Sequence, residues 1–412
     1  MSNASIVINL WGQCIGELHW CSNVNNTLFS FTKSYFDNNL NVFPIIADKE
    51  IARTNNSFYG EIKPIYKSLP SFLFESLPDS WERGYLAKQL KNSNKSLIQI
   101  SPIEKLAYIR NRSLGALEYQ IEDTLSKEND LYWFSQMADK YEGYLRDIKI
   151  PSLLETDLES ICSLGTCSVG LRPKVLLAIG RDTGEVRSGQ IEQEINYDYY
   201  ILKIGDFNTC WTKIEMAYYQ IAKKAGIKMM SSNLIKIDGA YHFLTKRYDR
   251  ANNKKLHVQS LAALSPQASS YEELFEVAEK LKLARGNIIE LYRRLLFNIV
   301  IHNVDDHTRN FSFIMDHSGK WFLSPAYDIS YPLVECIDHS MTLNGKRRKF
   351  RIDDILSIAH KYCIQNHEEI YSPILSAVSN LKEILESYGV SEQLKNSIYK
   401  RVSQNIEDLH SI

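Results

Sequence analysis

A polar stretch of nine residues constrains the fold of this chain more than any other feature. It runs His302-Asn303-Val304-Asp305-Asp306-His307-Thr308-Arg309-Asn310 and follows an apolar, helical segment. The apolar segments 311–315 and 321–323 come next, separated by Asp316-His317-Ser318-Gly319-Lys320, a pattern that predicts a β-hairpin. Asp328 follows just past this hairpin. Because a hairpin brings its two ends together, we expect Asn310 and Asp328 to face one site.

The spacing of these residues indicates a particular chemistry. Asp305 stands five positions before Asn310, as in the D-x-x-x-x-N motif of phosphoryl-transferring enzymes. There the acid accepts the proton of the attacking hydroxyl, while the amide oxygen and a second carboxylate hold Mg²⁺ on the nucleotide phosphates. Asp306 stands four positions before Asn310, so we assign Asp305 as the base. We expect Asp306 to cap the helix or to pair locally.

The polar stretch taken alone is also compatible with a simple turn or with a transition-metal site. Asn and Asp are common in polar turns after helices for conformational reasons. His302 and His307, together with the two aspartates, could bind a transition metal, although no further ligand cluster with suitable spacing accompanies them. Neither alternative accounts for the order of a glycine loop, a strand lysine, the acid and amide motif and Asp328 along the chain.

The glycine loop is Gly165-Thr166-Cys167-Ser168-Val169-Gly170-Leu171-Arg172-Pro173-Lys174, and an apolar strand is predicted directly after it at 175–179. Successive backbone N–H groups in such a loop can hold an anion, and Arg172 and Lys174 would add positive charge. It is not a Walker loop, because Leu171-Arg172 stands where Lys-Ser/Thr is required. An ordinary loop leading into a hairpin remains the alternative.

Lys203 lies in the apolar segment 199–204, which predicts a strand. A buried cation is costly unless an anion receives it, so Lys203 could contact the α- and β-phosphates of a nucleotide. Alternatively, its stem extends to water. Glu215, in the helix predicted at 211–225, could orient Lys203 or be solvated. The strand predicted at 241–244 leads into Lys246-Arg247-Tyr248, whose backbone could meet an adenine.

The bulk composition excludes several classes of protein. At 412 residues the chain is longer than one hydrophobic core usually serves, so we expect two or three lobes. Lys and Arg number 48 against 49 Asp and Glu, which gives no support for direct nucleic-acid binding. The seven cysteines lack C-x-x-C spacing, which argues against disulfides and zinc and favours a reducing cytoplasm. No apolar run is long enough to span a bilayer, so no membrane partner is expected.

Taken together, these residues resemble the HipA-like serine/threonine kinases, the toxins of type II toxin-antitoxin systems. The resemblance covers nearly the whole chain, and its two most specific parts are the Asp305 to Asn310 motif and Pro325-Ala326-Tyr327-Asp328. The other matching segments are the opening hairpin, Leu77-Pro78-Asp79-Ser80-Trp81, Leu114-Gly115-Ala116-Leu117, Arg172-Pro173-Lys174, Ile201-Leu202-Lys203 and Lys246-Arg247-Tyr248-Asp249-Arg250.

The resemblance implies an α+β fold of the two-lobed, protein-kinase-like kind. It implies a β-rich N-terminal domain at 1–125, a kinase N-lobe with the glycine loop at 126–250, and an all-helical C-lobe with the catalytic motif at 251–412. Asp305 would be the catalytic base, and Asn310 and Asp328 would bind Mg²⁺. The residues expected to contact ATP are Val169, Gly170, Leu171, Arg172, Pro173, Lys174, Lys203, Lys246, Arg247, Tyr248, His307, Asn310, Tyr327 and Asp328.

The resemblance also implies partners and regulation. A helix-turn-helix antitoxin would bind the chain, so that DNA is contacted only indirectly, and a protein such as an aminoacyl-tRNA synthetase would be the substrate. Members of the family phosphorylate a serine in their own glycine loop, and the corresponding residue here is Cys167. Self-phosphorylation would therefore fall on Thr166 or Ser168, or be absent. A kinase of a small metabolite and a pseudokinase that only binds an antitoxin remain the alternatives.

Overall fold

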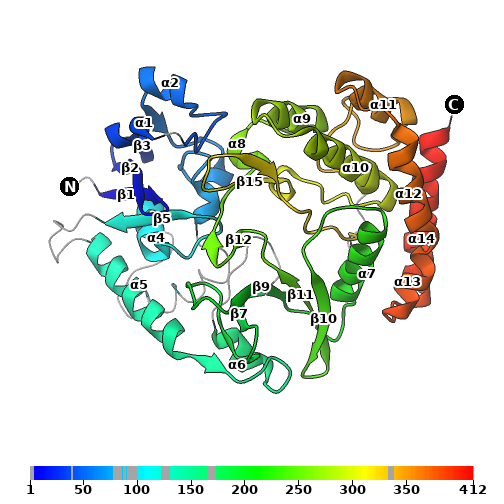
Figure 1. Cartoon of the computed structure of the whole chain (residues 1–412), viewed down its shortest axis with the longest axis horizontal. Coiled ribbons are helices and arrows are strands. Elements are labelled where there is room, and N and C mark those ends of the chain that lie inside the picture. The colour runs from blue at the N-terminus through cyan, green and yellow to red at the C-terminus, as the bar shows by residue number, and fades with distance from the viewer. Residues whose placement is uncertain are drawn as a thin grey trace. The chain divides into compact units, whose positions relative to one another are not determined.

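The computed structural model describes residues 4–38, 40–77, 86, 90, 100–121, 130–164, 173–332 and 338–411 (Figure 1). The chain divides into two compact units, each built from segments that are discontinuous in sequence. The first unit comprises Met1–Ile204, Asp249–Gln259 and Ile314–Lys320, and the second comprises Gly205–Tyr248, Ser260–Phe313 and Trp321–Ile412.

The first unit opens with a five-stranded sheet in the order β4-β3-β2-β1-β5. Trp11 and Gly12 adopt positive φ values of 52° and 75°, which make the tight turn between β1 and β2. The predicted opening hairpin is therefore confirmed, and the apolar residues 28–31, which predict a third strand, lie in β3. The strands are β1 (Ser5–Leu10), β2 (Gln13–Cys21), β3 (Asn26–Phe31), β4 (Ser57–Tyr59) and β5 (Leu117–Ile121).

An aromatic cluster packs one face of this sheet. Phe29 and Phe31 alternate with outward-facing residues along β3, and both are buried. The ring of Phe29 meets that of Phe72 edge to face, and Phe72 stacks on Phe43 with ring centroids 4.1 Å apart. Burial of apolar and aromatic side chains is the main term that stabilises such a sheet.

The helices of the first unit are mostly short. The sequence from Ile103 to Ile109 predicts a helix, which is confirmed and which begins at a capping box formed by Ser101 and Glu104. The sequence from Ser152 to Cys162 also predicts a helix, but that helix begins only at Leu158, because Asp157 caps it. The elements are α1 (Lys33–Asp37), α2 (Lys49–Thr54), α4 (Pro102–Ile109), α5 (Asp130–Asp147), α6 (Leu158–Ser163), and the 3₁₀ turns η1 (Pro64–Tyr66) and η2 (Phe74–Ser76).

Four further strands of the first unit pair in the order β6-β8-β7-β9. The strands predicted at 175–179 and 199–204 are confirmed as β7 and β9. A two-residue hairpin, β12 with β13, turns at Asn252 and Asn253, both with positive φ. The strands are β6 (Lys149–Ile150), β7 (Lys174–Gly180), β8 (Val186–Ser188), β9 (Tyr197–Lys203), β12 (Arg250–Ala251) and β13 (Lys254–Lys255).

The second unit is mainly helical and is built around α10. Figure 1 shows α12 and α14, in orange and red, alongside α10, and α10 also contacts α9 and α11. No helix in the described ranges is long and apolar enough to cross a membrane. The helices are α7 (Trp211–Lys224), α8 (Leu261–Leu264), α9 (Tyr271–Lys280), α10 (Arg285–Ile301), α11 (Ile352–Lys361), α12 (His367–Ser379), α13 (Leu381–Ser387) and α14 (Glu392–His410).

The fold mixes helices and sheets as predicted, but the expectation of an all-helical C-lobe at 251–412 is wrong. That range contains β14 (His257–Ser260), β15 (Ser312–Met315) and β16 (Trp321–Leu323), besides β13. All four residues of β14 are buried although its sequence, His-Val-Gln-Ser, is mostly polar, so burial by tertiary contacts overrides the weak local preference. The second unit also holds the hairpin of β10 (Ser232–Ile237) and β11 (Ala240–Lys246).

One predicted helix is divided in two. The sequence from Tyr371 to Tyr388 predicts one helix, but that helix is interrupted at Asn380, which ends α12 and precedes α13. The Asn380 side chain donates a hydrogen bond to the backbone carbonyl of Ser376. Asn side chains compete in this way with the helical backbone, which explains the break.

Candidate active site

The polar stretch leaves helix α10 through a sharp turn. His302 adopts a left-handed conformation with φ 61° and ψ 42°, and the next backbone N–H, of Asn303, donates to the Asn298 carbonyl at 2.9 Å. Glycine is the usual residue at such an exit, so a histidine here is a strained choice. Asp305 and Asp306 follow directly after this turn.

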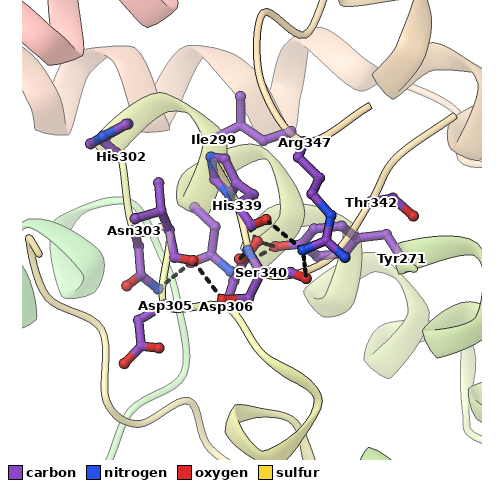
Figure 2. A network of polar contacts seen from close by, with 12 residues as sticks. Tyr271, Ile299, His302, Asn303, Asp305, Asp306, His339, Ser340, Thr342 and Arg347 are labelled. Atoms are coloured by element: carbon purple, nitrogen blue, oxygen red, sulfur yellow. Dashed lines mark hydrogen bonds and ion pairs between the residues drawn. The ribbon is translucent and has the colours of Figure 1, made fainter. Parts of the chain in front are cut away.

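The two neighbouring acids have opposite environments. The Asp305 side chain is 71% exposed, whereas Asp306 is buried. Asp306 accepts hydrogen bonds from the Tyr271 hydroxyl at 2.6 Å and the Ser340 backbone N–H at 2.7 Å, and its Oδ2 lies 2.8 Å from His339 Nδ1. Figure 2 shows Asp305 pointing away from this network. The assignment of Asp305 as the reactive acid stays a prediction.

The expectation that Asp306 caps the helix or pairs locally is wrong. Its three partners lie 33 to 35 positions away in sequence, so the bonds tie distant segments of the second unit together. Burial, and then the negative charge of Asp306, raise the pKa of Tyr271 well above its usual value, which keeps its hydroxyl protonated as a donor. We call Asp306, Tyr271, His339 and Ser340 the Asp306 network.

The loop that carries Asp305 is joined to this network through two amides. Asn298 Nδ2 donates to the Tyr271 hydroxyl oxygen at 3.1 Å, and Asn303 Nδ2 donates to Asn298 Oδ1 at 2.9 Å. Since all of these groups are buried and hydrogen-bonded, they hold a single backbone path up to Asp305. The sequence patterns alone assign no role to Tyr271, Asn298, His339 or Ser340.

The Asn310 side chain is oriented by a hydrogen bond to the backbone of Asp305, the predicted base. Its Nδ2 donates to the Asp305 backbone carbonyl at 2.7 Å, within the 3₁₀ turn η3 (Thr308–Asn310). That bond commits the amide nitrogen, so the amide oxygen is the atom left for a cation. Amide and carboxylate oxygens are what Mg²⁺ prefers. His307 lies beside the acid, with its Nε2 3.7 Å from Asp305 Oδ1.

The predicted hairpin after Asn310 is confirmed as β15 and β16, which pair with each other, so the end of β16 lies beside the start of β15. The Tyr327 hydroxyl donates to the Arg309 carbonyl at 2.8 Å and lies 2.5 Å from Ser312 Oγ. The immediate neighbours of Asn310 and Asp328 are thus in hydrogen-bond contact. Asp328 itself has a positive φ of 53°, a strained conformation of the kind found at ligand sites.

A buried ion pair fixes the segment before Asp328. Arg294 of α10 donates to the Ser324 carbonyl at 2.8 Å and to Glu290 Oε1 at 3.1 Å. Glu290 also accepts from the Lys228 backbone N–H at 2.9 Å, and the Lys228 carbonyl accepts from Ala326 N–H at 2.8 Å. Burial lowers the pKa of Arg294, and the Glu290 carboxylate opposes that shift. The segment is therefore anchored at two points.

The residues predicted near an adenine lie in this second unit as well. The Tyr248 ring stacks on Tyr327 with centroids 5.3 Å apart and an interplanar angle of 18°. Arg247 is buried, and the Lys246 backbone N–H donates to the Ser231 carbonyl at 2.9 Å. Tyr248 therefore contacts the same hairpin end that carries Asp328.

The predicted phosphate-binding lysines belong to the first unit. Lys174 of β7 and Lys203 of β9 are directly opposite each other in the antiparallel register, and both are buried. Residues opposite each other in such a pair share one face of the sheet, so two cations gather there. Pro173 adjoins this pair and accepts from Ile204 N–H at 2.9 Å. Thr166, Ser168, Val169, Gly170, Leu171 and Arg172 lie outside the described residues.

The predicted Mg²⁺ site has two protein ligands, Asn310 and Asp328. Among the described residues, no group of three or more His, Cys, Asp or Glu side chains is placed to hold a metal ion. A nucleotide-bound Mg²⁺ needs only one or two protein oxygens, because phosphates and water complete its octahedron. Asn310 and Asp328 supply two such oxygens, so the residue types fit this cation.

Comparison with known proteins defines the class of this molecule. The model of the HipA N-terminal domain matches residues 6–120, and that of the HipA-like C-terminal domain matches residues 166–393. The two regions together span most of the chain and occur in the order of a two-domain protein. The chain belongs to the HipA family.

Two individual relatives are informative. The HipA chain of a Shewanella oneidensis complex of HipA, HipB and operator DNA is 14% identical, with a TM-score of 0.63 over 98% of this chain and 96% of that one. This likeness shows a shared fold. A Sinorhizobium fredii protein named "Putative kinase Y4dM" is 27% identical over 156 residues, which span 33% of this chain and 38% of that relative.

Proposed function

We propose that this protein transfers the γ-phosphoryl group of ATP to a serine or threonine of another protein. The observation that carries the proposal is the pairing of an exposed carboxylate, Asp305, with an amide fixed against its backbone, Asn310, at 2.7 Å. Membership of the HipA family and the partial similarity to a protein named as a kinase support it.

Each group in the site has a distinct part in this reaction. Asp305 accepts the proton of the attacking hydroxyl as the oxygen of that hydroxyl bonds to the γ-phosphorus and ADP departs. Asn310 and Asp328 would hold Mg²⁺, which supplies charge neutralisation on the phosphates when it is bound. The opposed Lys174 and Lys203 suit the remaining phosphate charge. Tyr248, stacked on Tyr327, adjoins the nucleotide base.

The biological role we propose is a growth-arresting toxin held by an antitoxin. The similar Shewanella oneidensis HipA was solved with HipB and operator DNA, which supports an antitoxin partner and only indirect contact with DNA. The substrate would be a component of translation. Thr166 and Ser168 remain the candidates for self-phosphorylation of the glycine loop.

A phosphorylation assay with Mg-ATP tests the reaction. Wild-type protein incubated with cell extract should transfer label to protein, and Asp305→Asn should reduce that transfer by about 10²–10⁴-fold. Asp353→Asn is a matched control, because Asp353 is an exposed aspartate of α11 outside the site. Equal activity of Asp305→Asn and wild type would refute the proposal. Label confined to small molecules would identify a metabolite kinase instead.

A further inference from the structure

A hollow of the second unit lies between the start of the polar stretch, at His302, and helix α14. Its volume is about 400 Å³, within the range of small-molecule sites. It is lined by the end of α10, by the segment before α11 and by α14. We call it the basic pocket, and its defining residues are His302, His339, Arg348, Lys349, Phe350 and Arg401.

The rim of the basic pocket carries excess positive charge. The pocket is lined by three cationic side chains, those of Arg348, Lys349 and Arg401, and by one carboxylate, that of Asp408. Arg348 is partly engaged, since its Nε lies 3.5 Å from an exposed aspartate outside the pocket. Within the part of the chain that the structure describes, Lys349 and Arg401 form no hydrogen bond or ion pair. Two cations are therefore available to an anion.

The floor of the pocket is aromatic and buried. Phe350, His302 and His339 are each 3% exposed. The rings of His339 and Phe350 meet edge to face with centroids 5.2 Å apart, and those of His302 and His339 at 6.3 Å. Lys349, next to Phe350, has a positive φ of 52°, which for a lysine is strained backbone of the kind that gathers at ligand sites.

We propose that the basic pocket binds a small organic phosphate with a planar ring, such as a nucleoside monophosphate. The cations of the rim match a phosphate, whose oxygens accept charge-assisted hydrogen bonds from guanidinium and ammonium groups. The aromatic floor matches the flat apolar face of a base. The amide side chains of Gln404 and Asn405 add polar groups that could orient such a ligand.

The pocket is physically joined to the candidate active site. His339 lines the pocket and also contacts Asp306 Oδ2 at 2.8 Å, and Figure 2 shows His302 and His339 together with the backbone that leads to Asp305. His339 therefore belongs both to the basic pocket and to the Asp306 network, so a ligand in the pocket would contact a residue of that network.

Isothermal titration with AMP tests the binding. A saturating non-hydrolysable ATP analogue with Mg²⁺ first fills any nucleotide site, after which AMP should still bind with a stoichiometry of one. Arg401→Ala should weaken AMP binding at least about tenfold, since it removes a charge-assisted hydrogen bond. Lys400→Ala is the matched control, because Lys400 is the exposed preceding residue of α14 and does not line the pocket.

The design separates this proposal from the phosphotransfer proposal. If the ATP analogue does not bind, AMP should still bind once, and Arg401→Ala should still weaken it. Adenosine should bind at least about tenfold more weakly than AMP, because it lacks the phosphate that the rim receives. Absence of AMP binding beside the saturating analogue, or equal affinity in the Arg401→Ala variant, would overturn the proposal.

Discussion

Asp305 and Asp306 are adjacent, yet their substitution should have opposite consequences. Asp306 is buried and interacts with the hydroxyl of Tyr271, the imidazole of His339 and the backbone N–H of Ser340, and the first two of these residues are buried as well. Asp305 exposes most of its side chain, which makes no comparable contribution to packing. We expect Asp306→Ala to destabilise the fold and Asp305→Asn to remove activity without destabilising it.

The magnitude follows from the three bonds of Asp306. A hydrogen bond to a charged group contributes about 1.5–3 kcal/mol, and breaking a buried charged contact by removing one partner costs about 3–5 kcal/mol. We therefore expect Asp306→Ala to lower the free energy of unfolding by about 4 kcal/mol. Asp306→Asn keeps the shape and one acceptor oxygen, so about 2 kcal/mol is expected. An exposed substitution such as Asp305→Asn should stay within about 0.5 kcal/mol.

Urea unfolding followed by tryptophan fluorescence measures these differences. With a slope of about 2 kcal/mol per M, a loss of about 4 kcal/mol lowers the urea midpoint by about 2 M. The Asp305→Asn midpoint should match that of the wild type, while its phosphotransfer falls. If Asp306→Ala unfolded at the wild-type midpoint, or Asp305→Asn unfolded as early as Asp306→Ala, the division of roles between the two acids would be refuted.

Three further predictions address pH, the buried ion pair and the metal. Burial lowers the pKa of His257 to about 4, so the unfolded chain binds a proton first as pH falls from about 6.5. Stability should drop by about 3 kcal/mol over that window, and His257→Gln should abolish this part of the pH dependence of the urea midpoint. Arg294→Met should cost about 1.5–3 kcal/mol in the same assay, because it removes the donor of the Ser324 carbonyl and one charge-assisted bond of Glu290, which keeps its bonds to Arg293 and to the Lys228 N–H. EDTA should abolish phosphotransfer but leave the urea midpoint unchanged, because the proposed Mg²⁺ site at Asn310 and Asp328 is completed only by nucleotide; a lower midpoint would contradict this.

The features that the sequence predicted well depend on local patterns. The β1–β2 hairpin turns at Gly12, and the β15–β16 hairpin at Gly319, and both turns were visible as glycine between apolar runs. The failures depend on contacts that are distant in sequence. β14 is buried without an apolar pattern, and the partners of Asp306 come from segments more than thirty positions away. The three-part division at 125 and 250 stays a prediction.

One pattern in α10 was available in the sequence and joins both halves of the site. Glu290, Arg294, Asn298 and His302 recur at intervals of four, which places them along one slowly turning face of the helix. All four are buried, and the other buried residues of α10 are apolar or aromatic, so each polar side chain would be costly there without a partner.

Each of these polar residues has a contact that bears on the site. Glu290 and Arg294 hold the segment before Asp328, Asn298 holds Asn303 in the loop before Asp305, and His302 ends the helix. One helix face therefore fixes the segments that carry the predicted base and a predicted metal ligand, although these two residues lie on opposite sides of a hairpin. Polar residues spaced by four in a buried helix indicate which segments the helix must hold. Because the backbone on the way to Asp305 is fixed by buried amides, its carboxylate can stay exposed to a substrate and still keep a defined position.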